Sequence, residues 1–500
     1  MMKNKRLVVI LLLCILLGGL LVRLYRFDNP IADWHSWRQA ETSSVARNFA
    51  TNGFDLLHPR MDNISNVQSG LDNPQGYFFV EFPLYNAAQA GAFRLMPIIT
   101  LEEWGRLITI IASLLAAVFL YLIVVRHSNK EIGLLAAFFY TFIPFNIYYG
   151  RVILAEPSMV MASLGGIYFF DLYISVIARS KATKQSLRLP HSLSVVRNDK
   201  RYLWFTLSIL FTSIAFLLKP TAVFFILPMI YLAFKRFGWK TFTQWPLWLF
   251  TLLTLAPLIW WRMWMQQFPE GIPANTWLLN GNGIRFRPAF FRWMLYERLT
   301  ILISGYFGMV FVLFGLFKLK KVKESLFFVS FLVSSILYVT VFATGNVQHD
   351  YYQIPIMPSV AILFALGSYF LSRLTVKKVP VGIVLVVLCV LGSFFFSWQR
   401  VKDYFNINNP SIIVAGKAVD RLTPKDAKIV ANYNGDTSFL YQANRKGWAS
   451  FQDPMPVLIE KGADYLVLVN PTKADDGWKK EYKVVEQTPQ YLIFDLHSKP

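Results

Sequence analysis

Eleven long apolar runs fill most of the first 400 residues of this 500-residue chain. They lie near 7–23, 106–125, 132–149, 157–176, 203–218, 221–235, 244–262, 299–317, 325–343, 355–372 and 380–398. Because a helix needs about 20 apolar residues to cross the hydrocarbon core of a bilayer, the shorter runs would depend on support from neighbouring helices. The pattern predicts a polytopic α-helical membrane protein with about eleven transmembrane helices.

The net charge of +21 raises the alternative of a nucleic-acid-binding protein. Lysine and arginine, however, are concentrated in short loops between the apolar runs, which is typical of cytoplasmic loops in membrane proteins. These loops are 126–130, 179–201, 235–240, 318–323 and 373–378. All of them are cytoplasmic if the basic N-terminus is cytoplasmic and the first run is a retained signal anchor. We therefore expect a multi-pass protein of the cell (inner) membrane with no nucleic-acid partner.

The same topology organises the rest of the chain. A twelfth span over 82–97 would move the later basic loops outside, so this segment is predicted to be a re-entrant or interfacial helix. Residues 1–398 then form a multispan domain with a first external loop, 24–105, and a basic cytoplasmic insert, 176–202.

Residues 399–500 are less apolar and predict a small external α/β domain. Helices are expected at 411–422 and 456–461, and strands at 428–433, 463–469, 483–487 and 491–495. This domain has no glycine-rich nucleotide-binding or CxxC motif, so we interpret it as a structural or acceptor-docking cap.

The first external loop opens with a dense group of polar and aromatic residues, Asp33-Trp-His-Ser-Trp-Arg-Gln-Ala-Glu41. A helix that began at Asp33 would place Trp34, Arg38 and Glu41 on one face. Two interpretations stay open here. The group is either a functional site beside the membrane, with His35 and Trp37 contributing, or an amphipathic interfacial helix with its charges in water.

Two further charged groups lie where apolar runs meet the outer surface. Arg151 and Glu156 flank a turn between two runs, and Lys219 precedes Pro220 between two others. Ionisable residues at membrane depth are costly and are therefore candidates for function. The alternatives are a mutual salt bridge between Arg151 and Glu156 and a lysine that extends to the headgroups.

The two remaining outer segments also contain candidate ligand-binding residues. Arg285 and Arg287 flank a phenylalanine, and their guanidinium groups match the oxygens of a phosphate. His349, Tyr351 and Tyr352 precede a span and would offer hydrogen-bond donors at headgroup depth. Interfacial anchoring explains either arginine alone equally well, and an aromatic belt would explain the tyrosines but not the His349-Asp350 pair.

Together these segments resemble the membrane glycosyltransferases of the GT-C fold, in particular the glycosyltransferase family 39 group, which includes protein O-mannosyltransferases and the aminoarabinose transferase acting on lipid A. The matching elements are Ala46-Arg47-Asn48, Glu81-Phe-Pro-Leu84, Arg106-Leu107, Arg151 with Glu156-Pro157, Lys219-Pro220 and the segment from His349 to Pro358. The resemblance covers roughly 7–398, and the order and common side of the motifs are more specific than any one of them.

The resemblance implies a GT-C-like fold and inverting transfer of a sugar from a polyprenyl-phosphate carrier to an acceptor hydroxyl on the outer face, with a carboxylate as general base. In this family an acidic pair usually precedes the Ala-Arg-Asn motif, but that position is Arg38-Gln39 here, which leaves Asp33 and Glu41 as candidate bases. A basic residue that often precedes the Pro-Leu element is Glu81 here. Substrate binding is assigned to His35, Trp37, Arg38, Glu81, Arg151, Glu156, Lys219, Arg285, Arg287, His349, Tyr351 and Tyr352.

The expected partners are a polyprenyl-phosphate-linked sugar, membrane lipids and an acceptor that is a glycan, a lipid or a protein. No cysteine and histidine cluster has metal-ligand spacing, so no cofactor is expected to be required, although paired carboxylates could bind a divalent metal. Two other classes stay open: a multispan polysaccharide polymerase or ligase, and a secondary transporter, for which internal repeats and mid-membrane charges are expected.

Overall fold

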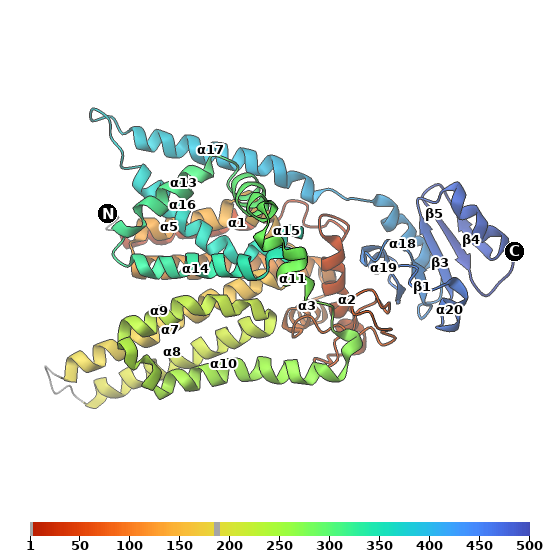
Figure 1. Cartoon of the computed structure of the whole chain (residues 1–500), viewed down its shortest axis with the longest axis horizontal. Helices are drawn as coiled ribbons and strands as arrows, with labels where there is room; N and C mark the ends of the chain where they lie inside the picture. Colours follow the sequence, from red (N-terminus) through yellow and green to blue (C-terminus); the bar gives the residue numbers. More distant parts are fainter. Residues whose placement is uncertain (1–3, 185–190) are drawn as a thin grey trace.

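The helices form an elongated bundle with a small α/β domain attached at one end (Figure 1). The computed structural model describes residues 4–184 and 191–500. We call the end of the bundle that carries the C-terminal domain the domain end, and the opposite end, where α1 (Lys5–Arg23) begins, the far end. The predicted basic insert at 176–202 includes residues 185–190, which lie outside the described residues.

Within the described residues, eight helices are long and apolar enough to cross a membrane, or nine if one bent pair counts as a span. Six of them are or contain α1, α4 (Leu101–His127), α7 (Glu156–Lys184), α8 (His191–Leu218), α10 (Trp245–Trp264) and α17 (Val381–Val401). The other two are Pro220–Thr243, in which short 3-10 turns extend α9 (Ile226–Phe237) at both ends, and Asp350–Leu371, which ends with α16 (Met357–Leu371). This confirms the predicted class of polytopic helical membrane protein.

The count falls below eleven because three of the predicted runs are shorter or broken. Pro144 ends α5 (Lys130–Phe142) and opens α6 (Pro144–Tyr149), since proline lacks the N–H that would continue the helix. The run near 299–317 bends by 116° between Pro288–Ile303 and Gly308–Lys321, and α14 (Ser325–Val341) has only 17 residues.

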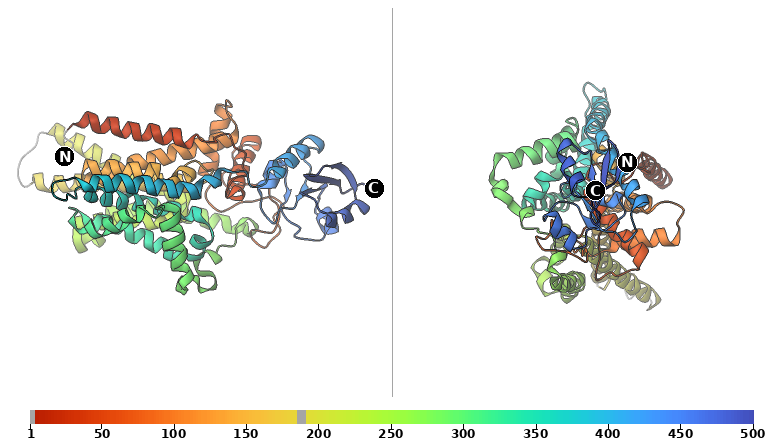
Figure 2. Two further views of the ribbon diagram at one scale, coloured as in Figure 1. Left: turned by 90° about the horizontal axis from the view of Figure 1, so that it is seen from above. Right: turned by 90° about the vertical axis from the view of Figure 1, so that its right-hand side faces the viewer.

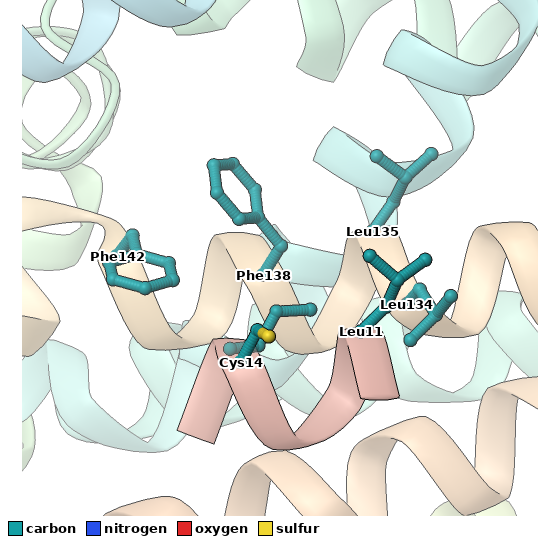
Figure 3. A pocket seen from close by; sticks show the side chains of 7 residues that line it. Leu11, Cys14, Leu134, Leu135, Phe138 and Phe142 are labelled. Atoms are coloured by element: carbon teal, nitrogen blue, oxygen red, sulfur yellow. The ribbon is translucent and has the colours of Figure 1, made fainter. Parts of the chain in front are cut away.

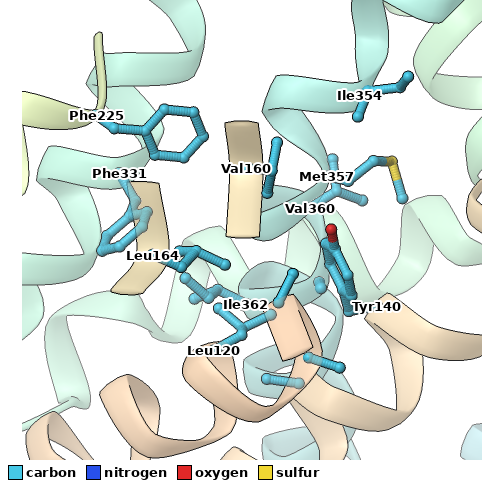
Figure 4. Close-up of a cluster of buried hydrophobic side chains, with 14 of the residues drawn as sticks. Leu120, Tyr140, Val160, Leu164, Phe225, Phe331, Ile354, Met357, Val360 and Ile362 are labelled. Atoms are coloured by element: carbon cyan, nitrogen blue, oxygen red, sulfur yellow. The ribbon is translucent and has the colours of Figure 1, made fainter. Parts of the chain in front are cut away.

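Helix α16 lies at the centre of the bundle and is buried over most of its length. Its residues are apolar on all sides, as expected for a helix that other helices surround. Figure 4 shows part of this core, in which Leu120 of α4, Val160 and Leu164 of α7 and Val360 of α16 lie close together. Gly367 lets α13 (Gly308–Lys318) pack closely, since an added Cβ would lie 2.0 Å from the Phe311 carbonyl oxygen.

Two short helices, α2 (Ser36–Asn52) and α3 (Leu84–Leu95), lie in the segment between α1 and α4, residues 24–100, which we call the first loop. Helix α3 has 12 residues, too few to span a bilayer. Helix α2 begins at Ser36 and not at Asp33 as predicted, because His35 has a left-handed backbone with φ of 53°. Trp34 therefore does not share a helical face with Arg38 and Glu41.

The C-terminal domain contains a five-stranded sheet in the order β2-β1-β3-β5-β4. The strands are β1 (Ile429–Ala431), β2 (Gly447–Trp448), β3 (Tyr465–Val469), β4 (Lys483–Gln487) and β5 (Tyr491–Asp495), and the helices are α18 (Pro410–Leu422), α19 (Ser438–Gln442) and α20 (Met455–Glu460). Strand β1 is parallel to β2 and β3, whereas β5 is antiparallel to β3 and β4. The sequence did not predict β2, which has two residues, or α19.

The C-terminal domain is joined directly to the first loop (Figure 2). The amide of Ile64 donates to the carbonyl oxygen of Gly447 at 2.9 Å, and the Gly447 amide donates to the carbonyl oxygen of Asp62 at 3.0 Å. An ion pair of 2.7 Å between Lys461 and Asp72 adds a second attachment. The first loop therefore extends the sheet at β2, and the two parts form one continuous surface over the domain end.

Candidate functional site

An apolar groove and the groups of charged residues lie in different parts of the molecule. A shallow groove between α1 and α5 has a volume of about 350 Å³ (Figure 3). It is lined by Leu11, Cys14, Ile15, Leu134, Leu135, Phe138 and Phe142. This lining has no ionisable group other than a thiol, so the groove has no set of groups for acid–base chemistry. Such groups are found at the domain end.

Five charged side chains form a continuous chain of ion pairs there, which we call the domain-end network: Glu41, Arg38, Glu81, Lys219 and Glu156. Arg38 donates to Glu41 at 3.2 Å and to both oxygens of Glu81 at 2.9 Å. Lys219 Nζ lies 3.4 Å from Glu81 Oε2 and 3.0 Å from Glu156 Oε1. The network joins α2, the segment before α3, the end of α8 and the start of α7, and Arg38 and its two carboxylate partners are buried.

The carboxylates of this network differ in their acidity. Burial raises the pKa of Glu41 to about 7, although Arg38 partly opposes the shift. Burial acts in the same direction on Glu81, but Arg38 and Lys219 together hold its pKa below the usual value. Glu81 is thus an ionised counter-charge, whereas Glu41 can exchange a proton near neutral pH.

Asp33 belongs to a second cluster, together with Gln39, Arg106 and Arg151. Its side chain is fully buried, accepts a hydrogen bond from Gln39 at 2.7 Å and lies 3.5 Å from Arg151 Nη2. Burial raises its pKa, and the positive charges of Arg106 and Arg151 oppose this. Arg151 also donates to the carbonyl oxygens of Tyr25 and Arg26. The possible salt bridge between Arg151 and Glu156 does not form, because Arg151 pairs with Asp33 and Glu156 pairs with Lys219.

Asp350 is the centre of a third cluster, which the sequence did not identify. Its carboxylate accepts hydrogen bonds from His35 at 2.7 Å, Trp34 at 3.2 Å and Tyr149 and Tyr404 at 2.5 Å each. These donors come from the first loop, α6 and the segment after α17. The sequence signal of this cluster is the His349-Asp350 pair, and the predicted binding residues include His349 but not Asp350.

An aromatic wall of His349, Tyr351, Tyr352, Trp37 and Trp277 borders these clusters. The His349 ring lies 5.6 Å from Tyr351 and 5.7 Å from Trp37 between centroids. Trp277, which was not predicted, lies 6.0 Å from His349. Burial and the neighbouring His35 lower the pKa of His349 to about 4, so its ring is uncharged at neutral pH.

The two loop arginines lie apart from these groups. Arg285 donates to the carbonyl oxygens of Thr340 at 2.5 Å and Val341 at 2.9 Å, and so caps the end of α14. Arg287 is exposed. Among the described residues neither makes a hydrogen bond or ion pair with the domain-end network. Arg298, from the same region, lies near the Asp350 cluster: its Nη1 is 3.9 Å from Asp350 Oδ2.

Several buried polar atoms at the domain end have no hydrogen-bond partner within the described residues. They include Asp33 Oδ2, Glu156 Oε2 and Asn63 Nδ2. Buried polar groups are normally paired, so unpaired ones are sites where a ligand or water can bind. The described residues contain no group of three or more histidine, cysteine, aspartate or glutamate side chains arranged to hold a metal ion.

Comparison by sequence gives no match to any protein-family model or to any curated protein. Comparison of structures gives clear matches. ArnT from Cupriavidus metallidurans, in the apo state, matches with a TM-score of 0.65 and 11% identity, over 96% of this chain and 97% of that chain. The same protein bound to undecaprenyl phosphate matches with a TM-score of 0.65 and 12% identity over the same shares.

AglB, the oligosaccharyltransferase of Archaeoglobus fulgidus, in complex with an inhibitory peptide and a dolichol-phosphate, matches with a TM-score of 0.57 and 10% identity. The match covers 96% of this chain and 74% of that chain. The chain therefore has the GT-C fold, as its sequence motifs predicted. Within that fold it is similar to ArnT along nearly the whole length of both chains, including the C-terminal domain.

Proposed function

We propose that this protein is a membrane glycosyltransferase that moves a sugar from a polyprenyl-phosphate carrier to an acceptor hydroxyl, with inversion at the anomeric carbon. The observation that carries the proposal is the domain-end network, in which buried carboxylates and cations alternate at one end of a GT-C bundle. Structures of the same fold bind undecaprenyl phosphate in ArnT and a dolichol-phosphate in AglB. These two complexes support a lipid phosphate as the carrier here.

In this mechanism Glu41 is the general base. The acceptor oxygen attacks the anomeric carbon while its proton passes to Glu41, and the bond from that carbon to the phosphate oxygen breaks with its electron pair. A pKa of about 7 suits Glu41 to this step. Asp33 is the less suitable candidate because it lies outside the domain-end network and pairs with Arg151 instead of with the cations that we assign to the phosphate. We assign Asp33 to positioning the start of the first loop.

Arg38 and Lys219 stabilise the negative charge of the departing lipid phosphate. Positive groups already fixed in a buried site are effective for this purpose because they need no reorganisation during the reaction. Glu156, with one unpaired carboxylate oxygen, orients the sugar. A leaving phosphate needs positive charge more than protonation, and Arg38 and Lys219 supply that charge. We therefore propose that transfer needs no metal ion, and activity that survives chelation would support this.

We further propose that the domain end faces away from the cytoplasm. The basic loops after α4, α9 and α13 and between α16 and α17 all gather at the far end (Figure 1), which fits the topology in which positive loops stay inside. A transporter would place its charged groups near the middle of the bundle, whereas the domain-end network lies at one end. Enzyme fusions at residue 500, active only when periplasmic, would test this orientation.

The test is a transfer assay with the purified protein in nanodiscs and labelled undecaprenyl-phosphate sugars. Glu41→Gln is expected to lower the release of undecaprenyl phosphate by about 10²- to 10⁴-fold, the usual contribution of a general base. Binding of unlabelled undecaprenyl phosphate should persist in this variant. Glu481→Gln, an exposed carboxylate of the C-terminal domain, is the matched control.

Two results would count against the proposal. Full activity in both Glu41→Gln and Asp33→Asn would remove the carboxylate base. Failure of the wild-type protein to bind undecaprenyl phosphate and to use any donor would reject the glycosyltransferase itself.

A further inference from the structure

Asp350 is a buried carboxylate that the mechanism above does not use. It is only 1% exposed. Its Oδ1 lies 2.7 Å from His35 Nε2 and accepts from the Tyr149 hydroxyl at 2.5 Å, and its Oδ2 accepts from the Tyr404 hydroxyl at 2.5 Å. The indole N–H of Trp34 lies 3.3 and 3.2 Å from the two oxygens. A carboxylate has about four acceptor positions, so these four donors leave little capacity for a substrate hydroxyl.

His35 is the partner of Asp350 with an unusual backbone. Its φ of 53° and ψ of 34° lie in the left-handed region, which is uncommon for residues other than glycine because the Cβ atom is crowded there. It occupies the position just before α2, and its carbonyl oxygen accepts from the amides of Arg38 at 3.2 Å and Gln39 at 3.4 Å. The conformation of His35 therefore determines where α2 begins.

The residue before His35 is fixed independently of α2. The Trp34 amide donates to the carbonyl oxygen of Tyr404 at 3.1 Å, and the two rings stack with their centroids 4.9 Å apart. The carbonyl oxygen of Trp34 accepts from the Tyr148 hydroxyl at 2.8 Å. His35 is thus the joint between an anchored residue and α2, and a change in its φ and ψ would change the direction of the whole helix.

We propose that Asp350 is a positioning residue, which keeps His35 in the left-handed conformation and so directs α2 and its side chains Arg38 and Glu41 into the domain-end network. The assignment of a role in transfer rests on the proposed function. A buried, paired charge often adds little net stability, whereas it can select one arrangement of the chain over others. The charge on Asp350 has this second effect, because it binds the side chain of the joint.

The test compares a loss of the contact with a loss of the need for it. Asp350→Ala removes the contact. His35→Gly removes the crowded Cβ atom, and since glycine adopts the left-handed conformation readily, the double variant no longer needs Asp350 to hold the joint. Asp171→Ala is the matched control, because Asp171 is a buried carboxylate at the far end that binds Arg126 and His127.

Amide hydrogen exchange of the full-length proteins in nanodiscs measures the joint without any turnover. In Asp350→Ala we expect exchange at 34–41 to become about tenfold faster, as for the loss of a hydrogen bond to a charged group, while α4 is unchanged. In the double variant the protection of 34–41 should return at least in part. Asp171→Ala should accelerate exchange at the far end only.

Transfer rates give the second readout. Asp350→Ala should lower kcat by about 10²-fold, the size of effect that a small misplacement of reacting groups produces. The double variant should be several times faster than Asp350→Ala, whereas the losses would add if the two residues acted separately. His35→Thr should be about tenfold slower than His35→Asn, because asparagine tolerates the left-handed conformation and a β-branched residue does not.

Three results would overturn the proposal: wild-type exchange at 34–41 in Asp350→Ala, a double variant that is no better protected and no faster than Asp350→Ala, or equal rates in His35→Thr and His35→Asn. If Asp350→Ala does not fold, Asp350→Asn has nearly the same volume and allows the same comparison. Failure of the proposed transferase function has a different signature. The wild-type protein would then neither bind undecaprenyl phosphate nor use a donor, while the exchange pattern would still decide whether Asp350 holds the joint.

Discussion

The two ends of the helical bundle carry two networks of charged residues that differ in how completely they are paired. At the far end His127 lies 3.1 Å from Asp171 through Nε2 and 2.6 Å from Glu324 through Nδ1, and Lys235 lies 2.6 Å from Glu324. Arg126 also binds Asp171. We call these five residues the far-end network. None of their polar atoms is among the buried, unpaired atoms of the described residues.

The contrast separates a structural role from a functional one. In the far-end network both ring nitrogens of His127 lie within hydrogen-bond distance of carboxylates. This histidine joins α4 to α7 and to the start of α14 as a saturated clamp. At the domain end Glu156 Oε2 and Asp33 Oδ2 have no hydrogen-bond partner among the described residues, although Arg151 forms an ion pair with Asp33 Oδ2. Unused hydrogen-bonding capacity marks the end where a ligand can bind.

Replacing the lysine of each network gives the largest expected difference between the ends. Lys219→Met removes the cation between Glu81 and Glu156, and we expect transfer to fall by about 10²- to 10³-fold because charge on the leaving phosphate is no longer stabilised. Lys235→Met at the far end should leave transfer unchanged. Both rates are measured in nanodiscs with labelled undecaprenyl-phosphate sugars.

Binding of undecaprenyl phosphate gives a second readout for the same pair. Loss of a charged contact to phosphate is expected to weaken binding about tenfold or more in Lys219→Met. Equal effects of the two substitutions on transfer and binding would mean that the two networks are not functionally distinct.

Replacing one histidine at each end tests stability. Here the variant at the far end is expected to lose more stability, and the variant at the domain end more activity. His127→Gln cannot keep both carboxylate contacts, so we expect the free energy of unfolding to fall by about 1–3 kcal/mol. The apparent melting temperature should fall by a few degrees, while transfer measured well below it stays normal. His35→Gln, beside Asp350, should instead lower transfer more than it lowers the melting temperature. A loss of activity in His127→Gln without a loss of stability would contradict the clamp.

The sequence predicts the parts of this molecule that depend on local patterns, but not those that depend on contacts between residues far apart in the chain. The apolar runs and the strands β3, β4 and β5 were predictable because their patterns are local. The start of α2 was not, since the left-handed conformation at His35 accompanies a contact with Asp350, 315 positions away in the chain. Ile64 and Gly447 pair only because the C-terminal domain folds back onto the first loop.

Arg38 and Glu81 show the same limit at the candidate site. At both positions the residue has the opposite charge to the one that is usual in the glycosyltransferase group that the sequence resembles. Each difference, taken alone, argues against a functional site at that position. The structure brings them together in a pair of 2.9 Å contacts across 43 positions. The charges at the two positions compensate each other, which a single sequence could not reveal because no local pattern links them.

The smallest expected effect is the pH dependence of transfer, which distinguishes Glu41 from every carboxylate of the far-end network. With a pKa of about 7, Glu41 is mostly protonated at pH 6 and mostly ionised at pH 8. Only the ionised form can accept the proton of the hydroxyl, so the rate should rise about tenfold over this range, with its midpoint about pH 7. Initial rates at saturating donor provide the measurement.

The residual activity of Glu41→Gln provides the control, because its dependence on pH should no longer have this midpoint. Burial raises the pKa of Glu41, and in the proposed mechanism the far-end network takes no part in proton transfer. The midpoint of the wild-type rate should therefore also persist in Glu324→Gln, in which the far-end carboxylate is neutral. A wild-type rate that stays flat between pH 6 and 8, or a midpoint that moves with Glu324 and not with Glu41, would place the proton acceptor outside the domain-end network.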